Sequence, residues 1–205
     1  VILAECDRAR RKAETKEDFL ASINVIEQQG NKMNDLIEQL LSLTRIQQGT
    51  EKYPLRVCDL SGFVEACCDE FVPADERGIS LRTSIAPGIE AAYNPSLLSR
   101  ALFNLLQNAY KYGAENGHIL VSLSEESGEA VTSVRDDGPG IPRAEQEKIW
   151  QRFYRCDAAR AEGGTGLGLS LVREIALVHH ARAEVKSEPG KGSDFRIVLP
   201  AVKKS

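Results

Sequence analysis

The sequence has few of the residues that mark secreted or metal-binding proteins. Its cysteines are odd in number and form no Cys-x-x-Cys pair: Cys6, Cys58, Cys67, Cys68 and Cys156. That usage argues against a disulfide framework or a zinc site and favours a reducing compartment. We interpret each cysteine as a small buried hydrophobe.

The chain also lacks a basic excess and long apolar runs. Its net charge is −4 over 205 residues, so we expect no nucleic-acid partner. The longest apolar runs, such as 119–123, are far too short to span a bilayer, and no signal peptide opens the chain. We therefore expect a soluble, cytoplasmic chain, with any membrane anchor on a segment upstream of Val1. Ordinary apolar content and this length suit one well-cored domain with an appendage, or two small domains.

Two glycine-rich stretches stand out, Asp136-Asp137-Gly138-Pro139-Gly140 and Gly163-Gly164-Thr165-Gly166-Leu167-Gly168-Leu169. Glycine has no Cβ, so such turns let backbone N–H groups approach a ligand, which is how chains commonly hold phosphate. The aspartate before the first turn adds an acceptor that would repel phosphate but suit an exocyclic amine. A phosphate cradle beside an amine acceptor predicts a nucleotide, with adenine as the base.

The first fifty residues predict a helical hairpin. Residues 1–13 resemble the end of a helix, and 12–18 are polar enough for a turn. A heptad seam follows, with intervals of four and three: Phe19, Ile23, Ile26, Gly30, Met33, Ile37, Leu40 and Thr44. Extra apolar residues widen this stripe, so a four-helix dimer is plausible. The alternative, packing of the long helix on the chain's own globular part, stays open. Gly49 is expected to end the helix.

After a linker at 51–55, residues 56–205 show an α/β pattern. We predict helices at 61–71, 97–112 and 169–180, with Pro95 opening the second. Strands are predicted around 57, 79–85, 89–93, 118–123, 130–135, 183–187 and 195–199. The hairpins at 127–128 and 189–192 make much of the sheet antiparallel. The expected fold class is α+β, with one mixed sheet and about three helices on one face.

Polar residues form a stripe on the predicted helix 97–112. Asn104, Asn108 and Lys111 follow steps of four and three, so they share one face. Two amides and an ammonium are costly to bury without a purpose. Carboxamide oxygens are hard ligands for Mg²⁺, and the lysine can neutralise phosphate charge. On its own such a stripe is often a solvated face, but beside two glycine-rich turns it predicts a ligand site.

Four motifs resemble those of sensor histidine kinases, in the family's order. Residues 104–112 resemble the N box, 136–142 the first glycine box, 150–155 the F box and 164–169 the second glycine box. Together they cover 55–200 and are specific, whereas one glycine-rich match alone is weak. The family belongs to the GHKL group of ATP-binding domains. The resemblance implies an α/β sandwich ATP-binding domain at 56–205, preceded by a remnant of the dimerisation hairpin at 1–50.

The resemblance also implies roles for individual residues. Asp136 would accept the adenine amine, Gly138, Gly140 and Ile141 would shape the base pocket, and Phe153 would anchor the lid at 156–163. Asn108, with Asn104 beside it, would hold Mg²⁺. Lys111 and Arg155 would contact phosphate, with Asn104 as the third catalytic residue, and Tyr112 would lie against base or ribose. The second turn would bring N–H groups to the phosphates through Gly164, Thr165, Gly166, Leu167 and Gly168.

One element of the family is absent from the sequence, namely the phosphorylated histidine of the first hairpin helix. The three histidines, His118, His179 and His180, lie in the ATP-binding half, and we interpret them as structural. Because Val1 begins in mid-pattern, we expect the acceptor upstream rather than missing from the protein. Smaller departures are Asn94, in place of an acidic residue, and 180–182, in place of a glycine pair.

The function that the resemblance implies is ATP-dependent phosphorylation of a histidine. The chain would bind Mg·ATP and transfer the γ-phosphoryl group to a histidine on the dimerisation helix. That histidine would pass the phosphoryl group to the receiver domain of a response regulator. It would act as a homodimer but could not phosphorylate itself. The full-length protein would be anchored in the bacterial membrane. Two alternatives remain: a nucleotide-responsive pseudokinase, and a serine-directed GHKL kinase, which the heptad seam disfavours.

Overall fold

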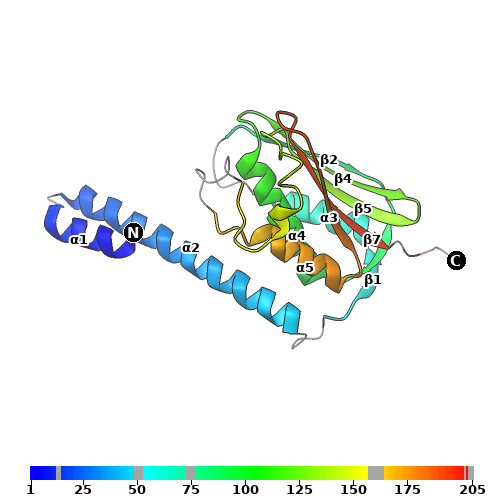
Figure 1. Ribbon diagram of the computed structural model, residues 1–205, viewed down its shortest axis with the longest axis horizontal. Coiled ribbons are helices and arrows are strands. Elements are labelled where there is room, and N and C mark those ends of the chain that lie inside the picture. Colours follow the sequence, from blue (N-terminus) through cyan, green and yellow to red (C-terminus); the bar gives the residue numbers. More distant parts are fainter. Residues whose placement is uncertain (13–14, 49–52, 73–76, 157–163, 201, 203–205) are drawn as a thin grey trace. The chain divides into compact units, whose positions relative to one another are not determined.

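The chain divides into two compact units, 1–44 and 45–205. The computed structural model (Figure 1) describes residues 1–12, 15–48, 53–72, 77–156, 164–200 and 202. The boundary falls inside the second helix, a few residues before the linker that the sequence predicts at 51–55. Residues 51 and 52 of that linker, and Gly49, lie outside the described residues.

The first unit contains α1 (Ile2–Lys12) and most of α2 (Lys16–Gln48). The start of α2 is capped reciprocally, because the Thr15 hydroxyl accepts from the Asp18 N–H (3.1 Å) and the Asp18 carboxylate accepts from the Thr15 N–H (3.1 Å). The buried Ser22 hydroxyl donates to the Glu5 carboxylate (2.9 Å), which ties the two helices together. The predicted hairpin is therefore present.

The heptad seam of α2 is largely exposed in the single chain. Gly30 does not interrupt the helix, and an added Cβ there would meet no atom within 4 Å. The exposed apolar side chains of the seam are Phe19, Ile23, Met33, Ile37 and Leu40. Such a stripe on a helix is the pattern that helical dimers bury.

The second unit is built on a five-stranded mixed sheet (Figure 1). Its order is β2 (Ser80–Ile85), β4 (His118–Glu126), β5 (Glu129–Arg135), β7 (Ser193–Pro200) and β6 (Arg182–Ser187). The pair β2–β4 is parallel and the other pairs are antiparallel. Three helices cover one face: α3 (Leu60–Glu70), α4 (Pro95–Tyr112) and α5 (Gly168–Val178). A short 3-10 helix, η1 (Lys148–Trp150), contacts α5.

The expectation of a single sheet is wrong. Strands β1 (Arg56–Asp59) and β3 (Glu90–Tyr93) pair antiparallel with each other in a separate two-stranded sheet. Each of them leads within one residue into a helix, β1 into α3 and β3 into α4. Because those helices lie on the face of the main sheet, the short strands follow them away from its plane.

The core lies between the helices and the main sheet. Most of its large, fully buried side chains come from α4, α5 and the central strands: Leu102, Leu105, Leu106, Ile119, Leu123, Leu171, Ile175 and Ile197. Each contributes about 1.5–3 kcal/mol by leaving water. Among the cysteines, the expectation of full burial holds for Cys67 and Cys68, whose thiol pKa values burial raises to about 11. The other three are only half-buried.

Asn94 joins the start of α4 to the end of α5. Its carboxamide oxygen accepts from the Leu97 N–H (3.1 Å) and caps α4. Its own N–H donates to Nε2 of the buried His179 (2.9 Å), and His179 Nδ1 lies 2.7 Å from the Ile175 carbonyl. Since Nε2 accepts, the proton sits on Nδ1 and the ring is neutral. The predicted structural role of His179 thus has a specific partner.

The burial of His179 predicts a pH-dependent stability. Desolvation lowers the pKa of His179 below the unfolded value, which is about 6.5. The unfolded chain therefore binds the extra proton first, and stability present above about pH 6.5 is lost as the pH falls, by up to about 1.4 kcal/mol per pH unit. Urea unfolding of wild type and His179→Gln at several pH values measures this, because carboxylate titrations cancel in the difference.

The matched control for this measurement is His180→Gln, since His180 is exposed. In His180→Gln the free energy of unfolding should fall on acidification as it does in the wild type, whereas in His179→Gln this fall should be absent. Equal pH slopes in all three proteins would contradict the assignment.

Candidate nucleotide site

Asp136 follows the last residue of β5 and is almost fully buried, with 5% of its surface exposed. Its Oδ1 accepts from the N–H groups of Gly138 (2.9 Å) and Ser193 (3.2 Å). Burial raises the pKa of this carboxyl to about 6, against the opposing effect of the two N–H donors. It is therefore ionised at neutral pH. Among the described residues no hydrogen bond reaches Oδ2, which makes Oδ2 the oxygen suited to accept from a ligand.

Three glycines bring backbones into contact around Asp136. A Cβ on Gly138 would lie 2.2 Å from the Tyr112 carbonyl oxygen, at the end of α4. A Cβ on Gly140 (φ +70°) would lie 2.1 Å from the Glu188 carbonyl oxygen, and one on Gly192 (φ +81°) 2.0 Å from that of Asp136. Side chains do not fit at such distances. The turn after β5 is therefore packed between α4 and the β6–β7 hairpin.

Hydrogen bonds fasten the turn to the same hairpin. The Gly190 N–H donates to the Pro139 carbonyl (2.7 Å), and the Ile141 N–H donates to the Ser187 hydroxyl (2.7 Å). The Asp136 N–H donates to the Ser193 carbonyl (2.8 Å), so the two residues are joined in both directions. The floor of the predicted base pocket is thus rigidly supported.

The second glycine turn meets the polar stripe of α4. A Cβ on Gly164 would lie 2.7 Å from Lys111 Nζ, and one on Gly168 would lie 2.7 Å from Asn104 Oδ1. Asn104 Nδ2 donates to the Arg100 carbonyl (2.7 Å), which directs its oxygen toward the turn. The structure therefore brings together two parts of the predicted phosphate site that lie some sixty residues apart in the sequence.

Lys111 and Tyr112 lie against each other. Lys111 Nζ donates to the Tyr112 hydroxyl (3.1 Å) and sits 4.7 Å from the centre of its ring. Asn108 lies one helical turn from Asn104 on the same stripe and is half-buried. The start of α5 at Gly168 adds helix N-terminal N–H groups, and the Thr165 hydroxyl accepts from the Leu167 N–H (3.2 Å).

The F box contacts the second turn through its backbone. The Phe153 N–H donates to the Gly166 carbonyl (2.9 Å), and a Cβ on Gly166 would lie 2.8 Å from the Phe153 carbonyl carbon. The Phe153 ring is 60% exposed and its φ is +61°. Its role as an anchor for the lid stays a prediction. The lid residues 157–163 lie outside the described residues.

Two other predicted site residues, Leu167 and Arg155, lie in different surroundings. The Leu167 side chain is fully buried in the core, so only its backbone is available to a ligand. Arg155 is the last residue of the F box and is half-buried, next to the end of the described segment. Neither placement tests a phosphate contact.

Sequence reasoning missed the contribution of the β6–β7 hairpin. Ser187, Gly192 and Ser193 support Asp136 and Ile141, yet the sequence suggested only a hairpin turn at 189–192 with no part in the site. The available signal was the second glycine of this turn, Gly192, because a simple turn needs fewer glycines. Asp137 was also missed: its carboxylate accepts from the N–H groups of Ala114 (3.2 Å) and His118 (2.8 Å).

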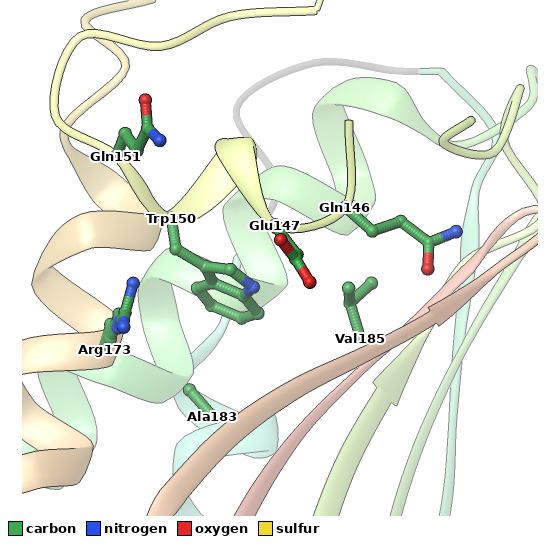
Figure 2. A pocket seen from close by; sticks show the side chains of 7 residues that line it. All are labelled: Gln146, Glu147, Trp150, Gln151, Arg173, Ala183 and Val185. Atoms are coloured by element: carbon green, nitrogen blue, oxygen red, sulfur yellow. The ribbon is translucent and has the colours of Figure 1, made fainter. Parts of the chain in front are cut away.

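A separate groove of about 580 Å³ lies beside η1 (Figure 2). The Trp150 indole stands in it between Arg173 of α5 and the strand residues of β6. It is lined by Gln146, Glu147, Trp150, Gln151, Arg173, Ala183 and Val185. None of the predicted nucleotide-binding residues lines this groove, so it is not the site described above.

Comparison with known proteins identifies the class. Residues 93–203 match the family described as histidine kinase-, DNA gyrase B-, and HSP90-like ATPase. This match covers more than half of the chain and contains all four motifs, so the chain belongs to that family. Among the described residues, no helix is long and apolar enough to cross a membrane.

Several relatives of the chain carry kinase names. The chain is 37% identical over 182 residues to the sensor histidine kinase RppB of Synechocystis sp., covering 87% of this chain and 40% of RppB. It resembles the mycobacterial sensor histidine kinase MprB (27% identity, TM-score 0.63, 73% of this chain and 99% of that one). The fold also matches full-length ShkA in complex with AMPPNP (24% identity, TM-score 0.79, covering 95% of this chain and 41% of that one). The chain thus spans less than half of RppB.

The contact at Gly192 predicts a large cost for one methyl group. Gly192→Ala should destabilise the chain by about 3 kcal/mol or more, because the new Cβ must displace the Asp136 backbone and the φ is left-handed. Gly190→Ala is the matched control, since it has a similar φ (+79°) in the same turn but open space at its Cβ. It should cost about 1 kcal/mol. Urea unfolding measures both, and equal losses would contradict the packing argument.

Proposed function

We propose that this chain is the ATP-binding catalytic portion of a sensor histidine kinase. The observation that carries the proposal is the convergence of three segments: the buried Asp136 turn, the polar stripe of α4 and the second glycine turn. A buried, ionised acceptor suits an adenine amine, and the N–H groups beside Lys111 suit phosphates. The family membership and the kinase relatives support the same reaction.

Asp136 would select the base. Its Oδ1 is held by two backbone N–H groups, which leaves Oδ2 to accept from the exocyclic amine of adenine. Guanine carries a carbonyl at that position, so an acceptor would face an acceptor. Gly138, Gly140 and Ile141 would form the wall of the pocket, and Tyr112 would lie against the base or ribose.

The phosphates would lie between the α4 stripe and the start of α5. Lys111 would neutralise their charge, Arg155 would reach the γ-phosphate, and the backbone from Gly164 to Gly168 would donate N–H groups. Mg²⁺ fits the donor set, because Asn104 Oδ1 faces the second turn and Asn108 lies one helical turn away. Their neutral oxygens would hold the ion jointly with phosphate oxygens. The ion would screen charge as the γ-phosphoryl group leaves.

The reaction would move the γ-phosphoryl group to an imidazole nitrogen and release ADP. In this chain His179 is buried and neutral. His118, at the start of β4, and His180, just after α5, lie in the second unit and not on the helical hairpin. We therefore infer that the acceptor lies on another segment of the dimerisation helix. The chain would bind ATP or ADP without phosphorylating itself.

The partners follow from the same assignment. The exposed seam of α2 supports a homodimer formed through the helical hairpin. The phosphorylated hairpin would then pass its phosphoryl group to the receiver domain of a response regulator. A membrane link, where the full-length protein has one, would lie outside this chain.

A single isosteric change tests the base-selecting role. In Asp136→Asn the Oδ1 atom keeps both backbone hydrogen bonds, so the side-chain NH₂ must replace Oδ2 and face the adenine amine. Donor would then oppose donor, and ADP affinity should fall on the order of a hundredfold or more. Calorimetric titration with ADP measures the loss.

Asp69→Asn is the matched control, because Asp69 is exposed on α3 and undergoes the same change of charge. It should bind ADP like the wild type. Unchanged ADP affinity in a folded Asp136→Asn chain would remove Asp136 from this role.

A further inference from the structure

Arg77 lies just before β2 and reaches the end of α4. Its guanidinium donates from Nη1 to the carbonyls of Tyr110 (2.6 Å) and Lys111 (2.6 Å), and from Nη2 to that of Gly113 (3.0 Å). All three acceptors are backbone oxygens. The side chain is therefore a cap for the last turn of the helix that carries the polar stripe.

The end of a helix needs such a cap. The last four carbonyls of an α-helix have no intrahelical donor, and the helix dipole makes this end negative. The Gly113 N–H serves the Ala109 carbonyl (2.8 Å). Arg77 serves the next two and adds a positive charge through charge-assisted hydrogen bonds. The planar fork of arginine can reach several carbonyls at once, which the single nitrogen of lysine does less well.

The loop after α4 is held from a second side by Asp137. The Arg77 carbonyl accepts from the Asn116 N–H (2.9 Å), and the Asp137 carboxylate accepts from the N–H groups of Ala114 and His118. Gly117 packs so closely that a Cβ would lie 2.4 Å from Asp137 Oδ1. The loop 113–118 thus connects Arg77 with the residue next to Asp136.

This arrangement places Arg77 behind the site rather than in it. The carbonyls that it holds flank Lys111 and Tyr112, and the Tyr112 carbonyl is the atom on which Gly138 packs. A shift of the last turn of α4 would move the lysine at the phosphates and loosen the turn that carries Asp136. A displacement of about 1 Å in such groups is enough to weaken function strongly.

We infer that Arg77 is a positioning residue of the nucleotide site, which fixes the last turn of α4 so that Lys111, Tyr112 and the Asp136 turn meet the nucleotide together. This inference rests on the proposed nucleotide-binding function. It assigns to a residue outside all four motifs a part in the affinity for adenine nucleotides.

The experiment compares three variants of the 205-residue chain by calorimetric titration with ADP, below their melting temperatures. Arg77→Ala should weaken ADP binding roughly tenfold, because it removes the charge-assisted hydrogen bonds that hold the last turn of α4. The loss is moderate because none of these bonds is made to the ligand. Arg77→Lys should lie between this variant and the wild type. Arg82→Ala is the matched control, since Arg82 is exposed on β2, and it should bind like the wild type.

Chemical rescue separates positioning from general destabilisation. Millimolar guanidinium ion, added to Arg77→Ala, should restore most of the ADP affinity by occupying the vacated place, and should leave wild type and Arg82→Ala unchanged. Wild-type affinity in a folded Arg77→Ala chain would overturn the inference. So would a loss that guanidinium does not reverse. If Arg77→Ala does not fold, wild-type affinity in Arg77→Lys would overturn it instead.

A second readout keeps the inference distinct from the proposed function. Amide hydrogen exchange without nucleotide should show faster exchange at Gly113, Asn116 and Gly117 in Arg77→Ala than in Arg82→Ala, because their N–H groups are bonded within the braced loop. A wild-type chain that does not bind ADP would contradict the proposed function. Unchanged exchange at these amides would contradict the brace itself.

Discussion

The structure of the second unit depends on places where two backbones touch with no room for a side chain. At Gly138, Gly140 and Gly192 the chain passes so close to a carbonyl oxygen that a single Cβ would overlap it. These contacts join α4, the turn after β5 and the β6–β7 hairpin into one rigid body around a buried carboxylate. A short polar side chain fixed in this way is an acceptor of defined direction, which selective recognition of a base requires.

The same constraint explains how the site combines opposite demands. A carboxylate that accepts from an amine must be kept apart from the phosphates, which it would repel. The structure supports Asp136 from the β7 side, while Lys111 and Asn104 face the second glycine turn from α4. Because α4 carries the polar stripe proposed to face the phosphates and also abuts Gly138, its last turn would couple the two halves. Arg77 is inferred to hold that turn.

Much of this could be predicted from sequence where the signal is local. The periodicity of 97–112 and the hairpins around 127–128 and 189–192 correspond to elements of the structure, and the spacing of Asn104, Asn108 and Lys111 placed them on one face. Contacts between distant segments could not be predicted. Nothing in the neighbourhood of Arg77 shows that it reaches carbonyls some 35 residues away, and Asn94 gives no sign of its bond to His179. The separate β1–β3 sheet likewise depends on where two helices pack.

The central claim is that this chain presents ATP to a histidine that it does not itself contain. It is tested most directly by incubating the chain with γ-labelled ATP, alone and with a separate helical hairpin that carries a histidine followed by an acidic residue. The account predicts no stable label on the chain alone, and acid-labile label on the hairpin when both are present. Stable label on the isolated chain, or an unlabelled hairpin beside a chain that binds ATP, would contradict it.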